Sequence, residues 1–222
     1  MTSNAFSCRR YAVNHFYQQF TIIDFLEMFM PGAITILNLN WCGLPLTDFW
    51  YAFFPEGMLG ISVYFIVMSY LAGHLLCQIT KILEKIPSFQ KPKKSVENYY
   101  IDAVEKKALS LGLLEYLPEL KTSSKYHALI LRRVYYFVLT NTDCRRLRLM
   151  HGFYGLCRAS IGATAIAAFC FVAKMQDNQT LCITAVLSCI GIIILLWIRA
   201  KKFSRIAAET TYESFLIYNE HK

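Results

Sequence analysis

Charged residues are scarce in this sequence. Asp, Glu, Lys and Arg make up 17% of the 222 residues, whereas soluble domains carry about a quarter of such residues. Hydrophobic residues account for 55%, and the mean hydropathy is +0.35. This balance excludes an ordinary soluble globule of this length, because so much apolar surface has to be kept away from water. The composition predicts an all-α integral membrane protein.

Motifs of the common enzyme classes are also missing. The sequence has no phosphate-binding P-loop, no H-E-x-x-H, no Gly-rich dinucleotide turn and no G-x-S-x-G. Its eight cysteines form no C-x-x-C pair and no Cys/His cluster with zinc spacing. Cys42 and Cys182, which we place near the outer face, are either a disulfide or two free thiols. We therefore expect no enzymatic activity, no cofactor and no metal ion.

Apolar stretches of spanning length are what the sequence does contain. An α-helix needs about 20 residues to cross the hydrocarbon core, and four stretches qualify, at about 25–46, 57–80, 153–173 and 181–198. Pro31 and Asn38 lie inside the first stretch, which is then tilted, kinked or partly re-entrant. No cleavable signal peptide is visible. The sequence thus predicts four transmembrane helices.

The few basic residues are unevenly distributed along the chain. Of the 23 Lys and Arg, 13 lie between Lys85 and Arg148, Arg9 and Arg10 precede the first stretch, and four follow the last one. The predicted outer connections hold only Lys174. By the positive-inside rule both termini are cytoplasmic. The net charge of +8 is then explained by orientation and by attraction to anionic lipids, so we expect a lipid bilayer and no nucleic acid as the charged partner.

Four segments follow from this topology. Residues 1–83 form a lead-in and a transmembrane hairpin, 84–150 a basic helical cytoplasmic segment, 151–200 a second hairpin, and 201–222 a cytoplasmic helical tail. We expect an interfacial helix within residues 1–20. We also expect a surface linker at 88–95, because Pro87 ends the preceding helix and the segment contains Pro92 and three lysines. Helices are expected from Ser95 and at about 125–140.

The tail has an apolar side that must be covered. Segment 95–140 is the natural cover, from the same chain or from a neighbour, and the tail is the predicted docking surface for a soluble partner. The residues on this side are Phe203, Ile206, Tyr212, Phe215 and Leu216.

Polar residues inside the apolar stretches are the candidates for function. Tyr70, His74, Gln78 and Lys81 recur at helical spacing and form one stripe. Either His74 hydrogen-bonds across helices while Lys81 reaches the headgroups, or the stripe lines an aqueous path in an oligomer. Arg158 raises the same question, since it either extends to the headgroups, pairs with another helix or lines a pore.

Small residues dominate the third stretch and predict close helix packing, which we assign to a homo-oligomer. This stretch is expected to be central, and the Leu/Ile-rich fourth stretch to face lipid. The packing candidates are Gly155, Ala159, Ser160, Gly162, Ala163 and Thr164.

The motifs "FMPGAITIL", "SYLAGHLL" and "CRAS", together with a Tyr-rich tail, resemble a group of bacterial four-span proteins similar to membrane components of anti-phage defence systems. The resemblance covers the whole chain as a layout. It implies an oligomeric inner-membrane effector or sensor for antiviral defence, acting with a soluble cytosolic partner by perturbing the membrane or by recruiting that partner. The alternatives are a non-conducting scaffold that anchors a soluble enzyme, and a small transporter or membrane enzyme.

Overall fold

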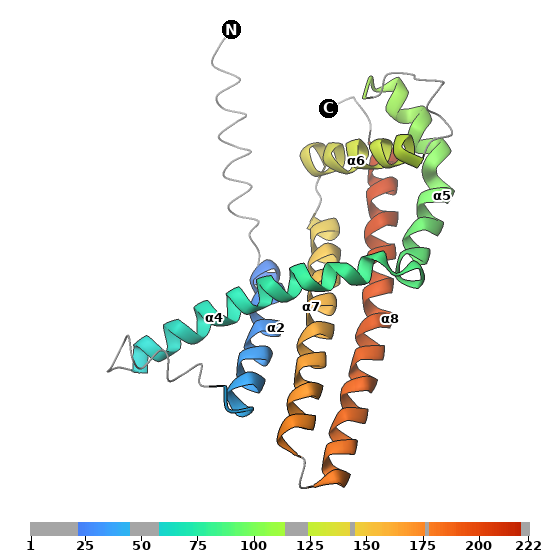
Figure 1. Cartoon of the computed structure of the whole chain (residues 1–222). Helices are drawn as coiled ribbons and strands as arrows, with labels where there is room; N and C mark the ends of the chain where they lie inside the picture. The colour runs from blue at the N-terminus through green and yellow to red at the C-terminus, as the bar shows by residue number, and fades with distance from the viewer. Residues whose placement is uncertain (1–21, 45–57, 114–123, 143–144, 176–177, 219–222) are drawn as a thin grey trace. The chain divides into compact units, whose positions relative to one another are not determined.

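The computed structural model describes residues 22–44, 58–113, 124–142, 145–175 and 178–218 (Figure 1). Within these ranges the regular structure is entirely helical, which confirms the all-α prediction for this part of the chain. The elements are α2 (Ile22–Trp41), α4 (Met58–Ile79), the 3₁₀ helix η1 (Thr80–Lys85), α5 (Pro87–Ser110), α6 (Ser124–Asn141), α7 (Arg145–Lys174) and α8 (Gln179–Ile217).

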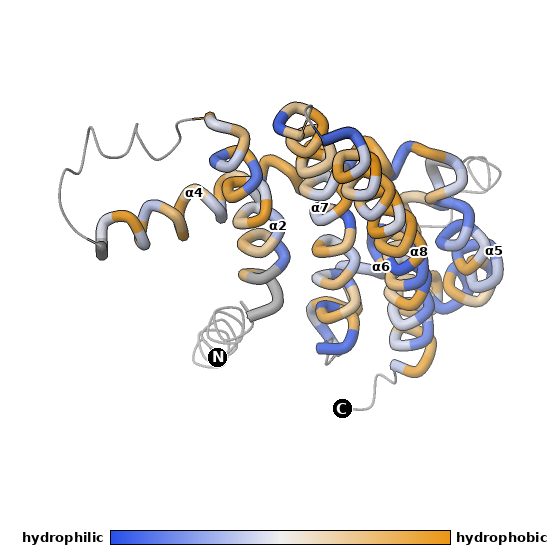
Figure 2. Tube along the Cα trace, turned by 90° about the horizontal axis from the view of Figure 1, so that it is seen from below, coloured by the Kyte–Doolittle hydropathy of each residue, from blue (hydrophilic) through white to orange (hydrophobic). Residues whose placement is uncertain are grey.

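Three helices of the described chain are long and apolar enough to cross a membrane: Gly60–Lys85, Arg145–Lys174 and Gln179–Ile217. They correspond to the second, third and fourth predicted stretches. Helix α2 overlaps the first stretch but is not among the three. Figure 2 shows the contrast in composition, with α8 mostly apolar and α5 rich in polar residues. The predicted interfacial helix at 1–20 lies outside the described residues.

One predicted boundary was wrong. Residues 88–95 are not a linker, because α5 begins at Pro87 and continues through Pro92 to Ser110. Proline is favoured at the first helical position, where its missing N–H has no intrahelical partner to lose. We gave Pro87 the role of a stop and overlooked its role as a start. Pro31 likewise does not end α2, which continues to Trp41.

The chain divides into two compact units. The membrane unit contains α2, α4 and residues 155–196, and the head unit contains residues 81–154 and 197–222. Helices α7 and α8 contribute residues to both units. The head unit carries 19 Lys and Arg against 10 Asp and Glu, whereas the membrane unit carries four against five. The positive charge of the protein is therefore concentrated in the head unit.

Helices α2 and α4 of the membrane unit cross with their backbones in close contact. A Cβ placed on Gly32 would fall on the carbonyl oxygen of Ser69, and one placed on Gly73 would fall on the carbonyl oxygen of Met28. Glycine is needed at both positions because any side chain would push the backbones apart. The two glycines therefore determine where along their lengths α2 and α4 cross.

Burial differs strongly among the three span-length helices. In α7, 39% of the most apolar window is buried, against 22% in the helix of Gly60–Lys85 and 6% in α8. The small residues of α7 allow other helices to approach it, whereas the outer face of α8 exposes large aliphatic side chains such as Leu187 and Leu195. This is the order expected from a small-residue central helix and a Leu/Ile-rich lipid-facing one.

The head unit has its own hydrophobic core, formed by α5, α6, the start of α7 and the end of α8. Ile130, Val134 and Phe215 are fully buried in it, and the ring of Phe137 packs edge-on against that of Phe215. The apolar side of the tail is thus covered by the same chain. Around this core, Tyr100 donates a hydrogen bond to Glu213 over 3.2 Å. Desolvation, followed by the Glu213 carboxylate, raises the pKa of Tyr100, so it remains a donor.

Lys107, the charged residue that interrupts the apolar side of α5, has a structural role. Its ammonium group donates hydrogen bonds to the carbonyl oxygens of Leu216 and Tyr218, at 2.7 and 2.6 Å. The last carbonyls of a helix have no intrahelical donor and carry partial negative charge, so a lysine there is stabilising. Lys107 therefore links α5 to the C-terminal end of α8.

Candidate functional site

The membrane unit contains a polar cluster formed by three helices. Cys77 of α4 lies at its centre, with its sulfur donating to Oε1 of Glu27 on α2 over 3.6 Å. From α7, Nη2 of Arg158 contacts the same sulfur at 3.2 Å and the carbonyl oxygen of Cys77 at 3.4 Å. Arg158 is only 6% exposed and Cys77 is also buried. One thiol therefore lies between an acidic and a basic side chain in an otherwise apolar unit.

The small residues of α7 make room for this cluster. A Cβ on Gly155 would fall on the carboxylate of Glu27, so the glycine one turn before Arg158 leaves the space that the acid occupies. Further along α7, Ala159 and Ala163 pack on Leu76, next to Cys77. A Cβ on Gly162 would lie 2.9 Å from Thr80. The spacing of small residues brings α7 close enough for Arg158 to reach α4.

The cluster decides between the interpretations of Arg158. A buried guanidinium bonded to the backbone and side chain of α4 is not extended to the headgroups, so interhelical pairing is the observed arrangement. Opposite charges on Glu27 and Arg158 compensate one another where water is scarce. Among the described residues no group of three His, Cys, Asp or Glu side chains is placed to hold a metal ion. The cluster is suited to holding α2, α4 and α7 together.

The predicted polar stripe of α4 lies elsewhere. His74, Gln78 and Lys81 are exposed, and Tyr70 is half-buried with its ring stacked on Phe25 at 6.5 Å. The imidazole of His74 stacks on Tyr70 of its own helix at 6.3 Å. The structure therefore brings Tyr70 and His74 together but leaves Arg158 on the buried side of α4, beside Cys77. Lys81 already belongs to the head unit.

The packing candidates of α7 make their contacts within the chain. Gly155, Ala159 and Ala163 are buried against α2 and α4, as described above. Ser160 and Thr164 are half-buried, and the Thr164 hydroxyl donates to the Ser160 carbonyl over 2.8 Å. The close approach that the pattern predicts is thus an intrachain contact at these positions.

The tail candidates are also used inside the chain. Tyr212 and Phe215 belong to the core of the head unit, and Leu216 packs at its edge. Ile206 and Phe203 are half-buried, and the ring of Phe203 stacks on Phe153 at 5.3 Å. A partner can reach Tyr212 or Phe215 only if this core opens.

Cys42 and Cys182 are free thiols in the structure. Cys42 donates to the carbonyl oxygen of Cys170 over 3.5 Å, and Cys182 to that of Phe171 over 3.9 Å. The sequence left open a disulfide or two free thiols, and the structure shows two free thiols.

Sequence reasoning missed the central member of the cluster. Cys77 gives no signal of its own, because a cysteine in an apolar stretch usually behaves as a small hydrophobe. Arg158 was identified as a candidate, but its contact with Cys77 was not. No protein-family model, no curated protein and no solved structure matches this chain.

Proposed function

We propose that the protein is an oligomeric four-span protein of the bacterial inner membrane, with both termini in the cytoplasm, that acts as an effector or sensor in anti-phage defence. It works with a soluble cytosolic partner. The oligomer is supported by one observation, the exposure of His74 and Gln78 on a helix of spanning length. The defence role is supported by the resemblance in layout and motifs.

Exposed polar groups on α4 support a second copy, because they lie on a helix of spanning length. His74 and Gln78 lie one turn apart, and their exposed neighbours Leu71 and Leu75 are apolar. Polar side chains inside a bilayer face other protein or water, because lipid chains offer no hydrogen bonds. Imidazole and amide groups each donate and accept, so the same two residues of a second copy are a suitable partner across a two-fold axis.

Helix α2 is the proposed fourth span. Its backbone packs directly on α4 at Gly32 and Gly73, and Glu27 reaches the cluster at Cys77. A helix held this way has its polar residues partly satisfied by protein, as a span that carries Glu27 requires. With four spans, the strongly basic head unit and the N-terminal Arg9 and Arg10 lie on the same, cytoplasmic side.

The oligomer can be tested by replacing the exposed pair. H74L/Q78L makes α4 more apolar, so insertion and folding of the chain are not impaired. Interhelical hydrogen bonds in membranes contribute about 1–2 kcal/mol in model peptides, so we expect the oligomer to dissociate about 5- to 30-fold more readily for each bond that is lost. The measurement is the mass of the full chain in mild detergent by light scattering, over a range of concentrations.

Helix α8 offers a matched control in T184L/S188L. These two exposed hydroxyls are also one turn apart, but each donates to the carbonyl oxygen four residues earlier, at 2.9 and 2.8 Å. Their replacement should leave the oligomer unchanged. An oligomer that is equally stable in H74L/Q78L and in the wild type, or a wild type that is monomeric at all concentrations, would refute the proposal.

A non-conducting scaffold is the second candidate. It is favoured by Arg158, whose charge is buried against Cys77 and not exposed along a passage. Ion flux through liposomes that contain the purified oligomer separates the two functions. Flux in the wild type that is lost in H74L/Q78L supports a pore lined by α4. An oligomer without flux supports the scaffold, and partner recruitment is then its mode of action.

A further inference from the structure

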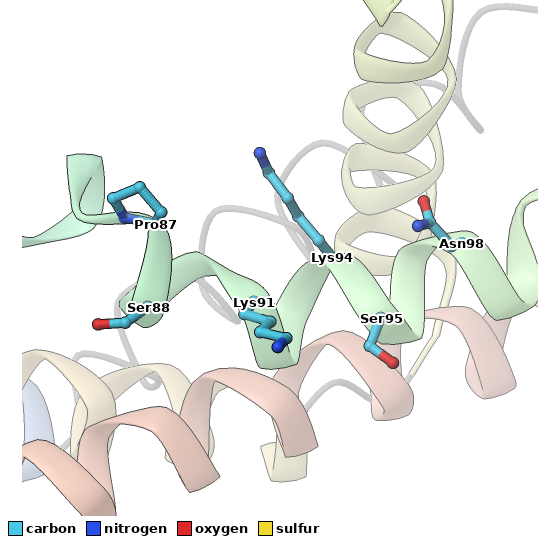
Figure 3. Close-up of a pocket in the computed structure, with 6 residues that line it drawn as sticks. All are labelled: Pro87, Ser88, Lys91, Lys94, Ser95 and Asn98. Atoms are coloured by element: carbon cyan, nitrogen blue, oxygen red, sulfur yellow. The ribbon is translucent and has the colours of Figure 1, made fainter.

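A shallow hollow lies on the first half of α5, in the head unit. It has a volume of about 530 Å³ and is lined by Pro87, Ser88, Lys91, Lys94, Ser95 and Asn98 (Figure 3). These residues recur every three or four positions, so one helix supplies the whole lining. Two of them are cations, and three others carry hydroxyl or amide groups. This combination is suited to phosphate oxygens, which accept hydrogen bonds and carry negative charge.

The two lysines of the hollow are available to a ligand. Lys91 and Lys94 are exposed, and no acidic side chain of the described chain is paired with either of them. Their neighbour Lys93 differs, because its ammonium group lies 3.6 Å from the carboxylate of Glu97. The positive charge of this part of α5 is therefore concentrated at the hollow.

The position of the hollow in the chain points to a membrane surface. The span-length helix ends at Lys85, and α5 starts two residues later at Pro87. With up to about 3.6 Å for each extended residue and a helical rise of about 1.5 Å from Pro87, Lys91 and Lys94 are at most about 18 Å along the chain from that end. Because the headgroup layer begins where the hydrocarbon core ends, both lysines are within reach of lipid phosphates.

We propose that this hollow binds the phosphate of an anionic lipid headgroup. The proposal rests on the proposed function in one respect, that Gly60–Lys85 spans the bilayer. An open site is what a headgroup requires, since the lipid must remain anchored in its leaflet. Figure 3 shows that the side chain of Lys94 points away from those of Lys91 and Ser95, so the lysines flank a surface and do not enclose a soluble phosphate.

The test compares two double variants of the full chain that lose the same charge from α5. K91Q/K94Q removes the two lysines of the hollow. K93Q/K106Q removes two exposed lysines of the same helix that do not line it. Each protein is purified in detergent with phosphatidylglycerol and phosphatidylcholine at equal concentration, and the lipids retained per chain are counted by native mass spectrometry.

A lysine near an anionic surface changes affinity about 5-fold, so K91Q/K94Q should retain phosphatidylglycerol about 30-fold more weakly. K93Q/K106Q should behave as the wild type, and phosphatidylcholine should not distinguish the three proteins. Equal retention of phosphatidylglycerol by the two variants would overturn the proposal. Equal thermal unfolding of both variants shows that any loss is not a folding defect.

Titration with inorganic phosphate separates the two sources of this chemistry. If phosphate alone binds saturably in the millimolar range or tighter, and K91Q/K94Q abolishes that binding, the hollow is a site for a soluble anion and the lipid proposal is wrong. Retention is counted per chain and does not require an oligomer. The two proposals can therefore fail separately. If H74L/Q78L dissociates and K91Q/K94Q retains phosphatidylglycerol as the wild type does, only the lipid proposal fails. If H74L/Q78L does not dissociate and K91Q/K94Q loses phosphatidylglycerol, only the oligomer proposal fails.

Discussion

Arg158 shows how a charged residue is accommodated in an apolar helix. It lies in the span-length helix α7 and is nearly fully buried, so its charge is compensated by protein groups and not by water. Its guanidinium and the Glu27 carboxylate contact the same sulfur atom, which places the opposite charges at most about 7 Å apart. In a medium of low dielectric constant such a pair stabilises the helices that contribute it.

Arg158→Met should therefore destabilise the membrane unit. The substitution keeps much of the side-chain volume but removes the contacts of Nη2 with the sulfur and the carbonyl oxygen of Cys77, and the positive charge near the half-buried Glu27. Loss of hydrogen bonds from a charged group costs about 1.5–3 kcal/mol. The measurement is the thermal unfolding of the full chain in detergent. Lys174→Met is the matched control, because it removes one exposed positive charge from the other end of α7 and should leave the midpoint unchanged.

The sequence predicted which residues are unusual better than it predicted what they contact. The sequence identified Arg158 as unusual in its surroundings, because it is charged within an apolar pattern. It could not identify the partners of such a residue, since these depend on the rotation and depth of helices that are far apart in the chain. Cys77 and the carbonyl oxygens of Leu216 and Tyr218 carry no pattern in the sequence that marks them as partners.

At the scale of helices, the crossing of α2 and α4 depends on two glycines that meet backbone atoms. Gly73 differs in this from Gly155, whose neighbour is the end of the flexible Glu27 side chain. A side chain can move to another rotamer, whereas a helix backbone cannot be displaced without separating the two helices. The crossing is therefore the less tolerant of the two contacts.

Gly73→Ala should separate α2 from α4. Overpacking of a close contact costs about 1–3 kcal/mol, and the loss of the backbone contact should also weaken the cluster at Cys77. Gly191→Ala is the matched control, because no atom lies within 4 Å of a Cβ at that position of α8. Alanine is the better helix former, so the control should be neutral or slightly stabilising. Unfolding midpoints in detergent check both, and equal midpoints would contradict a close crossing.

Helices were predicted from the sequence more reliably than their ends. Long apolar runs located the parts of α7 and α8 at 153–173 and 181–198, whereas the helices themselves extend over Arg145–Lys174 and Gln179–Ile217. The predicted start of α5 was wrong because a proline can follow the end of one helix or begin the next. The sequence alone did not decide which of these positions Pro87 occupies. The crossing at Gly32 and Gly73 was missed, since isolated glycines in a membrane helix do not reveal which neighbour approaches them.

For the whole molecule, the division into two units coincides with a division of charge. The head unit has nine more basic than acidic residues, and the membrane unit has one more acidic than basic. Positive charge near span ends sets the orientation of a membrane protein. The same distribution therefore predicts that the head unit is in the cytoplasm.

The number of spans can be decided by reporter fusions at two positions. A reporter inserted after residue 120 should be on the cytoplasmic side whether α2 spans or not, because the basic residues between Lys85 and Arg148 keep this segment in the cytoplasm. The N-terminus differs. With α2 as a fourth span it is cytoplasmic, and a fluorescent protein that matures only in the cytoplasm should fluoresce there. With three spans it is outside, and alkaline phosphatase fused at the N-terminus should be active.

Arg9 and Arg10 favour a cytoplasmic N-terminus, because two arginines before a span resist translocation. An active phosphatase at the N-terminus would place α2 outside the bilayer, and phosphatase activity at residue 120 would reverse the orientation of the entire protein.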